Sequence, residues 1–206
     1  TSVTGNVIIN RTINALNATA LTGIGGNLTL NNNPVGWTDF DVSFAALTTV
    51  AGNLTVQNNA GLGTCCLIPC RITAAMKTVS GNTGNCATLA IATTTCAPTT
   101  SITPDPAEVC AGIDLVLDGN PSNGTTPFAH AWTGIHIDSL NDATIQSPTF
   151  NAANSGSFIL TYTVTDDNGC TASDDISITV LDNPIATITP DPAAVCPDTD
   201  IILDGN

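Results

Sequence analysis

The sequence predicts an all-β chain in which a short solenoid of stacked coils precedes an antiparallel β-sandwich. Three observations lead to this fold class. First, a Gly-Asn dipeptide recurs within residues 1–97 at spacings of 21, 26 and 29 residues, beside short runs of alternating apolar and polar residues. Second, residues 98–187 contain longer alternating runs separated by turn residues. Third, residues 102–120 and 188–206 are identical at 13 of 19 positions, an offset of 86 that is typical of tandem domains.

Charge and cysteine content restrict the class of protein further. The net charge is −14, and it is uneven: residues 1–100 carry +1 whereas residues 101–206 carry −15. Such an acidic half repels nucleic acid and anionic membranes. No run of 18 apolar residues is present, so we expect no membrane insertion. Eight cysteines against one methionine indicate an oxidising compartment, and hence a secreted protein.

Each unit of the first half contains one short strand. Residues 21–33 and 47–59 align best, reading LTGIGGNLTLNNN and LTTVAGNLTVQNN. One strand per unit cannot bury an apolar face alone, so we expect the units to stack as coils. Asn33 and Asn59 would then occupy equivalent turns and bond to the backbone of the neighbouring coil. The side chains expected to form one stacked apolar column are Val7, Ile9, Leu28, Leu30, Leu54 and Val56.

Units of the form VxGNLTLxNN, followed by a Cys-Cys pair and a later Gly-Asn-Cys, resemble the receptor-L-domain-like segments of large Bacteroidota surface proteins. The resemblance covers residues 1–97. It implies a leucine-rich-repeat-like solenoid closed by a cap of disulfides whose pairing stays open. A metal site is the alternative, but this half has no histidine and a secreted setting favours disulfides. The cap cysteines are Cys65, Cys66, Cys70, Cys86 and Cys96, an odd number in which Cys70 is the extra one.

The outward side chains of these strands are Asn, Thr and Gln. They form either an inert solvated sheet or a surface that binds sugar. Sugar-binding surfaces usually add aromatic side chains, and this half offers only Trp37, Phe40 and Phe44, in the loop between two coils. The sequence therefore favours the inert sheet.

The second half begins after a Thr/Pro-rich linker at 93–106 and shows the pattern of an antiparallel sandwich. Residues 158–165 and 176–180 alternate between apolar and polar, and Asp-Asp-Asn-Gly at 166–169 predicts the hairpin turn between them. Residues 158–180 resemble the last hairpin of PKD-type immunoglobulin-like repeats, although the signature that follows the tryptophan of true PKD domains is missing. The resemblance covers 98–187 and implies that Trp132 fills the core.

A disulfide between Cys110 and Cys170 is expected within this sandwich. The expectation rests on the cysteine content of the module and on the 86-residue offset, which makes Cys196 the counterpart of Cys110. Such a bridge closes a loop of about 60 residues and contributes on the order of 4 kcal/mol.

Several polar clusters could carry chemistry. His130, His136 and Asp138 share one strand parity as zinc ligands would, but a strand followed by a loop with surface histidines is favoured. Aspartates near the domain ends, such as Asp118 and Asp166, could gather calcium, yet no D-x-D-x-D-G loop is present and turn formation is favoured. Asp-Ser-Leu at 138–140 resembles the Bacteroidota O-glycosylation motif, which implies a sugar on Ser139.

No motif of an enzyme is found. The chain lacks G-x-S-x-G, H-E-x-x-H and P-loop patterns, and we expect neither catalysis nor a cofactor. We expect instead a secreted structural or adhesive protein at the cell surface. The alternative is a carbohydrate-binding accessory module of a secreted enzyme, whose ligand would be a glycan.

The repeated segment 188–206 suggests how such a protein assembles. It corresponds to the opening strands of a second, incomplete immunoglobulin-like repeat. Its apolar residues would need a partner sheet, so we expect self-association head to tail into a fibre or filament. Cys196 would then be available for a disulfide to a cap cysteine, such as Cys70, of the next subunit. Truncation of a longer chain is the alternative.

Overall fold

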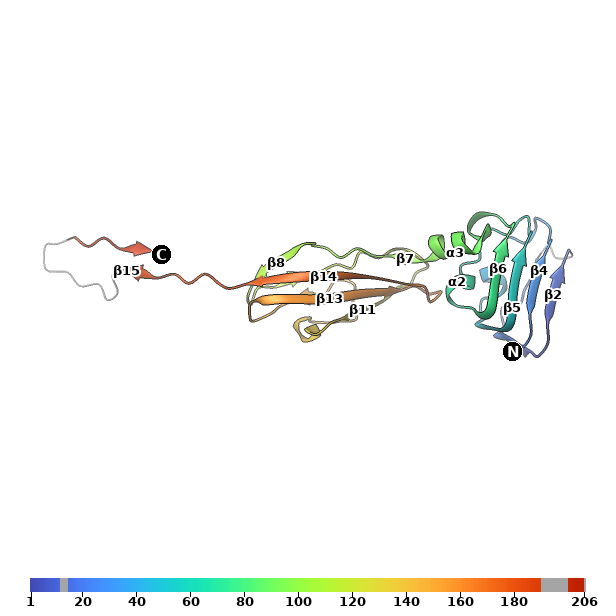
Figure 1. The fold of residues 1–206 in the computed structure, drawn as a ribbon, viewed down its shortest axis with the longest axis horizontal. Coiled ribbons are helices and arrows are strands. Elements are labelled where there is room, and N and C mark those ends of the chain that lie inside the picture. Colours follow the sequence, from blue (N-terminus) through green and yellow to red (C-terminus); the bar gives the residue numbers. More distant parts are fainter. Residues whose placement is uncertain (12–14, 190–199, 206) are drawn as a thin grey trace.

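The computed structural model describes residues 1–11, 15–189 and 200–205. About 40% of the residues are in strands and 12% in helices, so the fold is β-rich. Figure 1 shows an elongated molecule with three consecutive parts. A coil stack (residues 1–96) lies at one end, a sheet unit (98–181) in the middle, and a thin C-terminal segment at the other end. Within the described ranges, every helix is too short or too polar to span a bilayer.

The coil stack is held together by parallel pairing between successive coils. β2 pairs with β4, β4 with β5, and β5 with β6, while the shorter β1 and β3 extend the sheet along the first half of β5. Strands of neighbouring coils therefore lie side by side, across the long axis of the molecule in Figure 1. The strands are β1 (Ser2–Val3), β2 (Val7–Asn10), β3 (Gly23–Ile24), β4 (Leu28–Asn31), β5 (Thr49–Gln57) and β6 (Thr73–Ser80).

The predicted apolar column is confirmed. Leu28 pairs in register with Leu54, and Leu30 with Val56, and all four side chains are buried. Val7 and Ile9 pair with the same positions of β4 and pack, half-buried, against this core. Alternation along each strand places these side chains inside the stack, and the parallel register aligns them from coil to coil.

Side-chain hydrogen bonds form ladders along the corners of the stack. At the Gly-Asn corner, Asn6 Oδ1 accepts from the Asn27 N–H at 2.8 Å and Asn27 Oδ1 accepts from the Asn53 N–H at 2.7 Å. At the opposite end of the strands, Asn59 Oδ1 accepts from the Asn33 N–H at 3.1 Å, and Asn59 Nδ2 donates to the Leu30 carbonyl at 3.0 Å. The predicted bonds to the backbone of the neighbouring coil are thus confirmed for Asn59, whereas the Asn33 side chain donates to Asn59 Oδ1 at 2.8 Å instead.

The glycine of the Gly-Asn corner is required by close approach of the neighbouring coil. A Cβ on Gly52 would overlap Asn27 Oδ1, and one on Gly26 would overlap Asn6 Oδ1. The asparagine side chain of one coil therefore lies directly over the glycine of the next, so the two residues recur together in the first three units. The fourth dipeptide, Gly81-Asn82, follows β6 and lies at the other corner, where Asn82 Oδ1 accepts from the Asn59 N–H at 2.9 Å.

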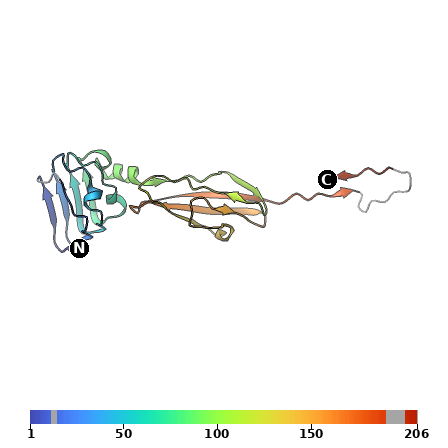
Figure 2. The ribbon, with the colours of Figure 1, turned by 180° about the vertical axis from the view of Figure 1, so that it is seen from behind.

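The first helix lies on the side of the stack away from the paired strands, and the last helix lies at the end next to the sheet unit (Figure 2). Thr88 caps the last helix by accepting from the Ile91 N–H, and the hydroxyls of Thr93 and Thr95 donate to carbonyls four residues earlier. The prediction of a linker from residue 93 is therefore wrong for 93–96, which form the last turn of this helix. The helices are α1 (Phe40–Ser43), α2 (Leu67–Cys70), η1 (Gly84–Cys86) and α3 (Leu89–Cys96).

The loop aromatics are not available to a ligand. Trp37, Phe40 and Phe44 are all buried, because α1 turns back into the stack. Trp37 Nε1 donates to Ser43 Oγ at 2.9 Å, and the rings of Phe40 and Phe44 lie 4.7 Å apart. The less favoured alternative, in which these side chains serve a sugar site, is wrong for them, because they fill the core.

The main sheet of the sheet unit has the order β11-β13-β14-β8. β13 and β14 form a long antiparallel hairpin, whose turn is the predicted Asp-Asp-Asn-Gly, and β8 adds to β14 in parallel. Two smaller pairs, β9 with β12 and β7 with β10, complete the unit. Its elements are β7 (Pro98–Thr99), β8 (Ala107–Cys110), β9 (Leu115–Val116), β10 (Ser122–Asn123), β11 (Ala129–Thr133), η2 (Ile137–Ser139), β12 (Thr149–Phe150), β13 (Gly156–Thr165) and β14 (Thr171–Leu181).

Trp132 and Tyr162 lie at the centre of the second core, as expected for the tryptophan. Their rings are 4.8 Å apart and both are buried. Trp132 Nε1 donates to the Ile145 carbonyl at 3.0 Å, so its polar atom is satisfied. Burial, together with the nearby Asp118 carboxylate, raises the pKa of Tyr162 to about 12. The tyrosine is therefore neutral and holds a hydrogen bond to His130 Nδ1 at 2.6 Å.

The C-terminal segment reproduces one pairing of the sheet unit. β15 (Ile188–Thr189) pairs with β16 (Asp204–Gly205), with Thr189 opposite Asp204. The counterparts of Thr189 and Asp204, 86 residues earlier, are Thr103 and Asp118, and these two residues form the same antiparallel bridge in the sheet unit. The surroundings differ, because Ile188 is 58% exposed whereas its counterpart Ile102 is 3% exposed.

Candidate functional site

The junction between the coil stack and the sheet unit is covalent. Cys65 pairs with Cys86 and Cys66 with Cys96, so the cap of the stack is closed by two disulfides. Cys70, the extra cap cysteine, pairs with Cys170 of the sheet unit across a sequence separation of 100. We call this bridge the junction staple.

The staple corrects the predicted Cys110–Cys170 disulfide. Cys170 immediately precedes β14, whereas Cys110 pairs with Leu181 at the opposite end of the same strand. Eleven extended residues separate the two ends by roughly 35 Å, and a disulfide requires Cα atoms within about 7 Å. Cys110 has no disulfide partner among the described residues. Cys196 lies outside them, and its suggested partner Cys70 is already bridged.

The hairpin turn that carries Cys170 is braced by Asp166. This buried carboxylate accepts from the Cys170 N–H at 2.8 Å through Oδ1 and from the Thr125 N–H at 3.0 Å through Oδ2. Asn168 adds a bond from Nδ2 to Thr125 Oγ1 at 2.9 Å. The predicted alternatives for Asp166, calcium ligand or turn former, are thereby distinguished: Oδ1 closes the turn at Cys170, and Oδ2 joins the turn to the backbone of Thr125.

On the other side of the junction, Asp41 holds the cap helix. Its carboxylate accepts from the N–H groups of Cys66 at 2.7 Å and Leu67 at 2.9 Å, at the start of α2. Burial raises the pKa of Asp41 to about 6, and repulsion from Asp39 adds to this shift, while the two backbone bonds oppose it. Lys77 Nζ donates to the Pro69 carbonyl at 3.0 Å, beside the stapled cysteine.

A small cavity of about 290 Å³ lies between the two parts, beside the staple. Its lining combines α1 and α2 of the stack with the hairpin turn of the sheet unit. Both parts therefore contribute to the walls of this cavity. The lining residues are Asp41, Val42, Ala45, Leu67, Arg71, Asp167 and Asn168.

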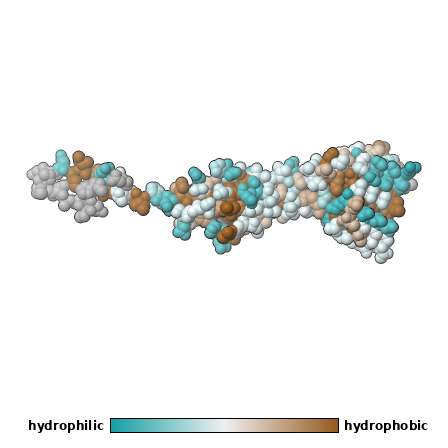
Figure 3. All heavy atoms as spheres, viewed as in Figure 1, coloured by the Kyte–Doolittle hydropathy of each residue, from teal (hydrophilic) through white to brown (hydrophobic). Residues whose placement is uncertain are grey.

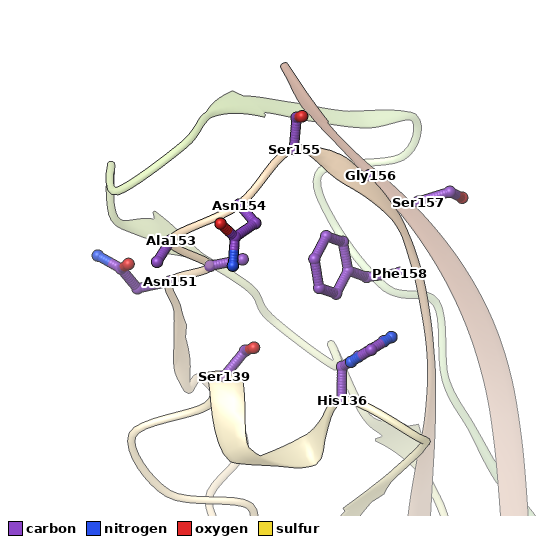
Figure 4. A pocket seen from close by; sticks show the side chains of 10 residues that line it. His136, Ser139, Asn151, Ala153, Asn154, Ser155, Gly156, Ser157 and Phe158 are labelled. Carbon is purple, nitrogen blue, oxygen red and sulfur yellow. The ribbon is translucent and has the colours of Figure 1, made fainter. Parts of the chain in front are cut away.

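A second hollow lies beside Ser139 in the sheet unit (Figure 4). It encloses about 400 Å³ between η2 and the segment leading into β13. His136 and Ser139 project from η2 toward Phe158, and Asn154 lies across from them. The His136 and Phe158 rings meet edge to face at 4.7 Å. Ser139, the predicted glycosylation site, is half-buried, and its carbonyl accepts from the Asn151 N–H at 2.8 Å.

The predicted histidine group does not come together as a site. His130 contacts Tyr162 in the core, whereas His136 follows the end of β11 and packs on Phe158. The strand ends at Thr133, and Gly134 follows it so close to the Ile159 carbonyl oxygen that a Cβ would lie 2.6 Å from that atom. Across residues 1–11, 15–189 and 200–205, no three His, Cys, Asp or Glu side chains gather as metal ligands would.

Comparison with known proteins gives only distant likeness. No protein family and no curated protein matches the chain. Among solved structures, a nucleoside hydrolase-related hypothetical protein from Saccharophagus degradans, described as associated with carbohydrate metabolism, has a TM-score of 0.34 at 16% identity over 41% of this chain. The chain spans about a quarter of that protein, 26%.

Two further structures are similar to parts of the chain. The PKD domain from the KIAA 1837 protein has a TM-score of 0.36 at 19% identity, covering 42% of this chain and 90% of that one. InlP of Listeria monocytogenes has a TM-score of 0.22 at 13% identity, covering 85% of this chain and 64% of that one. The weak neighbours thus include a PKD domain and a leucine-rich-repeat protein.

Proposed function

We propose that the chain is a structural or adhesive segment of a secreted cell-surface protein, with a mechanical rather than a catalytic role. In this proposal the coil stack is a leucine-rich-repeat-like solenoid and the sheet unit is a PKD-type immunoglobulin-like sandwich, as in the Bacteroidota surface proteins that the sequence resembles. Three disulfides fit a secreted protein.

The observation that carries this proposal is the junction staple. It joins two parts that each have a separate hydrophobic core. Neither core needs the other, so the disulfide serves to fix their connection and not to complete a fold. A covalently fixed, end-to-end arrangement suits a spacer or fibre element.

Exposed apolar side chains on the C-terminal segment support assembly through this end (Figure 3). Leu203 is 55% exposed, while its counterpart Leu117 in the sheet unit is fully buried. In the sheet unit, the equivalent segment is covered by the β13–β14 hairpin side chains. We infer that β15 and β16 dock on another copy of the chain, giving head-to-tail association.

Light scattering on the purified chain tests this association. We expect mass to increase with protein concentration, and a variant combining Ile188→Ser with Leu203→Ser to remain monomeric. Ile159→Ser, which removes an exposed isoleucine from β13, is the matched control and should associate like the parent chain. A monomer at every concentration tested, with and without reductant, would reject assembly.

A second candidate function is carbohydrate binding by the hollow beside Ser139. Its lining places hydroxyl and amide groups around the Phe158 ring and contains no carboxylate, lysine or arginine, a composition that suits a saccharide. NMR titration with a panel of neutral oligosaccharides tests it. His136→Ala and Asn154→Ala should weaken binding, whereas Ser173→Ala on the outer side of β14 should not. Absence of any shift at millimolar sugar would reject this candidate.

A further inference from the structure

The connectivity of the junction staple determines which residues carry tension. We propose that the Cys70–Cys170 disulfide makes β14 the load-bearing strand of the sheet unit and removes residues 71–169 from the path of force. When the chain is pulled at both ends, tension follows the shortest covalent route. That route runs along the stack to Cys70, crosses the disulfide to Cys170, and continues directly into β14.

β14 is suited to this role because it spans the sheet unit from one end to the other. It begins next to Cys170 at the junction and ends at Leu181, where the chain leaves toward the C-terminal segment (Figure 1). A β-strand is already extended to about 3.3 Å per residue, so tension along it releases almost no further length. Force enters β14 at Cys170 and leaves it at Leu181, so no neighbouring strand is pulled away from it.

The neighbours of β14 remain paired under this load. β13 pairs with it in an antiparallel register from Gly156 to Thr165, and β8 pairs with it in parallel from Ala107 to Cys110. Without the staple, force would enter the unit through β7 and leave through Leu181. Lengthening would then require β14 to separate from both neighbours. The staple thus converts a unit that unfolds under tension into one that does not.

The coil stack behaves differently. Residues 1–69 stay on the route of tension, and the strands β2, β4 and β5 lie across the long axis (Figure 1). Each coil can therefore separate from the next by breaking its pairing one bond after another. The molecule is expected to extend through its stack while its sheet unit keeps a fixed length.

This inference gives the proposed structural role a mechanism and rests on that role for its biological meaning. Its measurement is independent of assembly, because it uses single molecules. A chain that stays monomeric in light scattering can still show the predicted lengths, so the two proposals fail separately.

Single-molecule force spectroscopy with handles at both ends tests the proposal. In the parent chain the staple excludes 100 residue steps from the stretched length. In the variant Cys70→Ser/Cys170→Ser, the Cys66–Cys96 bridge still excludes 30 steps, so the stretched length gains 70 residue steps. At about 3.3–3.6 Å per residue, the variant should stretch roughly 23–25 nm further than the parent chain. Reductant, which opens every bridge, should add about 33–36 nm to the parent chain.

Cys110→Ser is the matched control, because this thiol has no disulfide partner among the described residues. It should stretch to the same length as the parent chain. If the parent and the double variant reach equal lengths, the staple does not carry the load and the proposal is wrong. Should the double variant fold poorly, the reductant arm decides on its own, since a gain well below 33 nm rejects the proposed route.

Discussion

Replacing Asn59 with alanine should destabilise the coil stack more than any other polar substitution in it. The Asn59 side chain is fully buried and contacts three neighbours. Its Oδ1 accepts from the Asn33 N–H and from Asn33 Nδ2, and its Nδ2 donates to the Leu30 carbonyl and to Asn82 Oδ1. Alanine would leave at least two of these buried groups without a partner.

The expected cost follows from those unpaired groups. Each buried donor or acceptor left unsatisfied costs about 1–3 kcal/mol, so Asn59→Ala should lower the free energy of unfolding by about 3–5 kcal/mol. That is a large part of the about 5–15 kcal/mol by which domains are usually stable. Urea unfolding, followed by far-ultraviolet circular dichroism under oxidising conditions, measures it.

Asn53→Ala is the matched control. Asn53 lies in the same coil and is exposed, and its side chain makes no hydrogen bond within the described residues. Its removal should change the free energy of unfolding by less than about 0.5 kcal/mol. Equal effects of the two substitutions would show that the buried asparagine ladder does not stabilise the stack.

Three further substitutions test the packing and the electrostatics. Leu54→Ala should lower the free energy of unfolding by about 2–5 kcal/mol, because its fully buried side chain lies within the apolar column; a loss well under 1 kcal/mol in urea unfolding would contradict this. Gly52→Ala should cost about 1–3 kcal/mol, since its methyl group would overlap Asn27 Oδ1, and the same assay measures it. The pKa of Asp41 is raised to about 6, so its ionised form opposes folding above that pH. Stability should therefore rise as the pH falls from about 7 to 4. Asp41→Asn should remove this rise. If the difference in free energy of unfolding between this variant and the parent chain stays the same from pH 7 to 4, the raised pKa of Asp41 is wrong.

The local features of the stack could be predicted from the sequence because they repeat. Alternation identified Leu28 and Leu54 as inward, and the parallel register then made them neighbours. The recurrence of Asn33 and Asn59 at equivalent positions indicated a turn that bonds to the next coil. A repeated structure tests each assignment several times within one chain, which is why the apolar column and the backbone bonds of Asn59 could be predicted.

Features that depend on how separate elements meet could not be predicted in the same way. The pairing of Cys170 depends on which end of β14 faces the stack, and alternation within a strand does not specify this. The odd number of cap cysteines was the available signal, because it left Cys70 without a partner. Likewise, Phe40 was assigned to a loop because the four-residue helix α1, which places it in the core, is too short to show a helical period.

The asparagine ladders also determine where the stack can change its length during evolution. Successive asparagines of the Gly-Asn corner are separated by 21 and then 26 residues, yet both intervals end in the same hydrogen bond. The additional residues of the longer coil fall between Asn33 and Thr48, the stretch that contains α1. Insertions are thus tolerated on the side away from the paired strands, whereas one added residue between Asn27 and Asn33 would disrupt both ladders. New loops can diversify on one side of such a protein while the sheet that joins its coils stays unchanged.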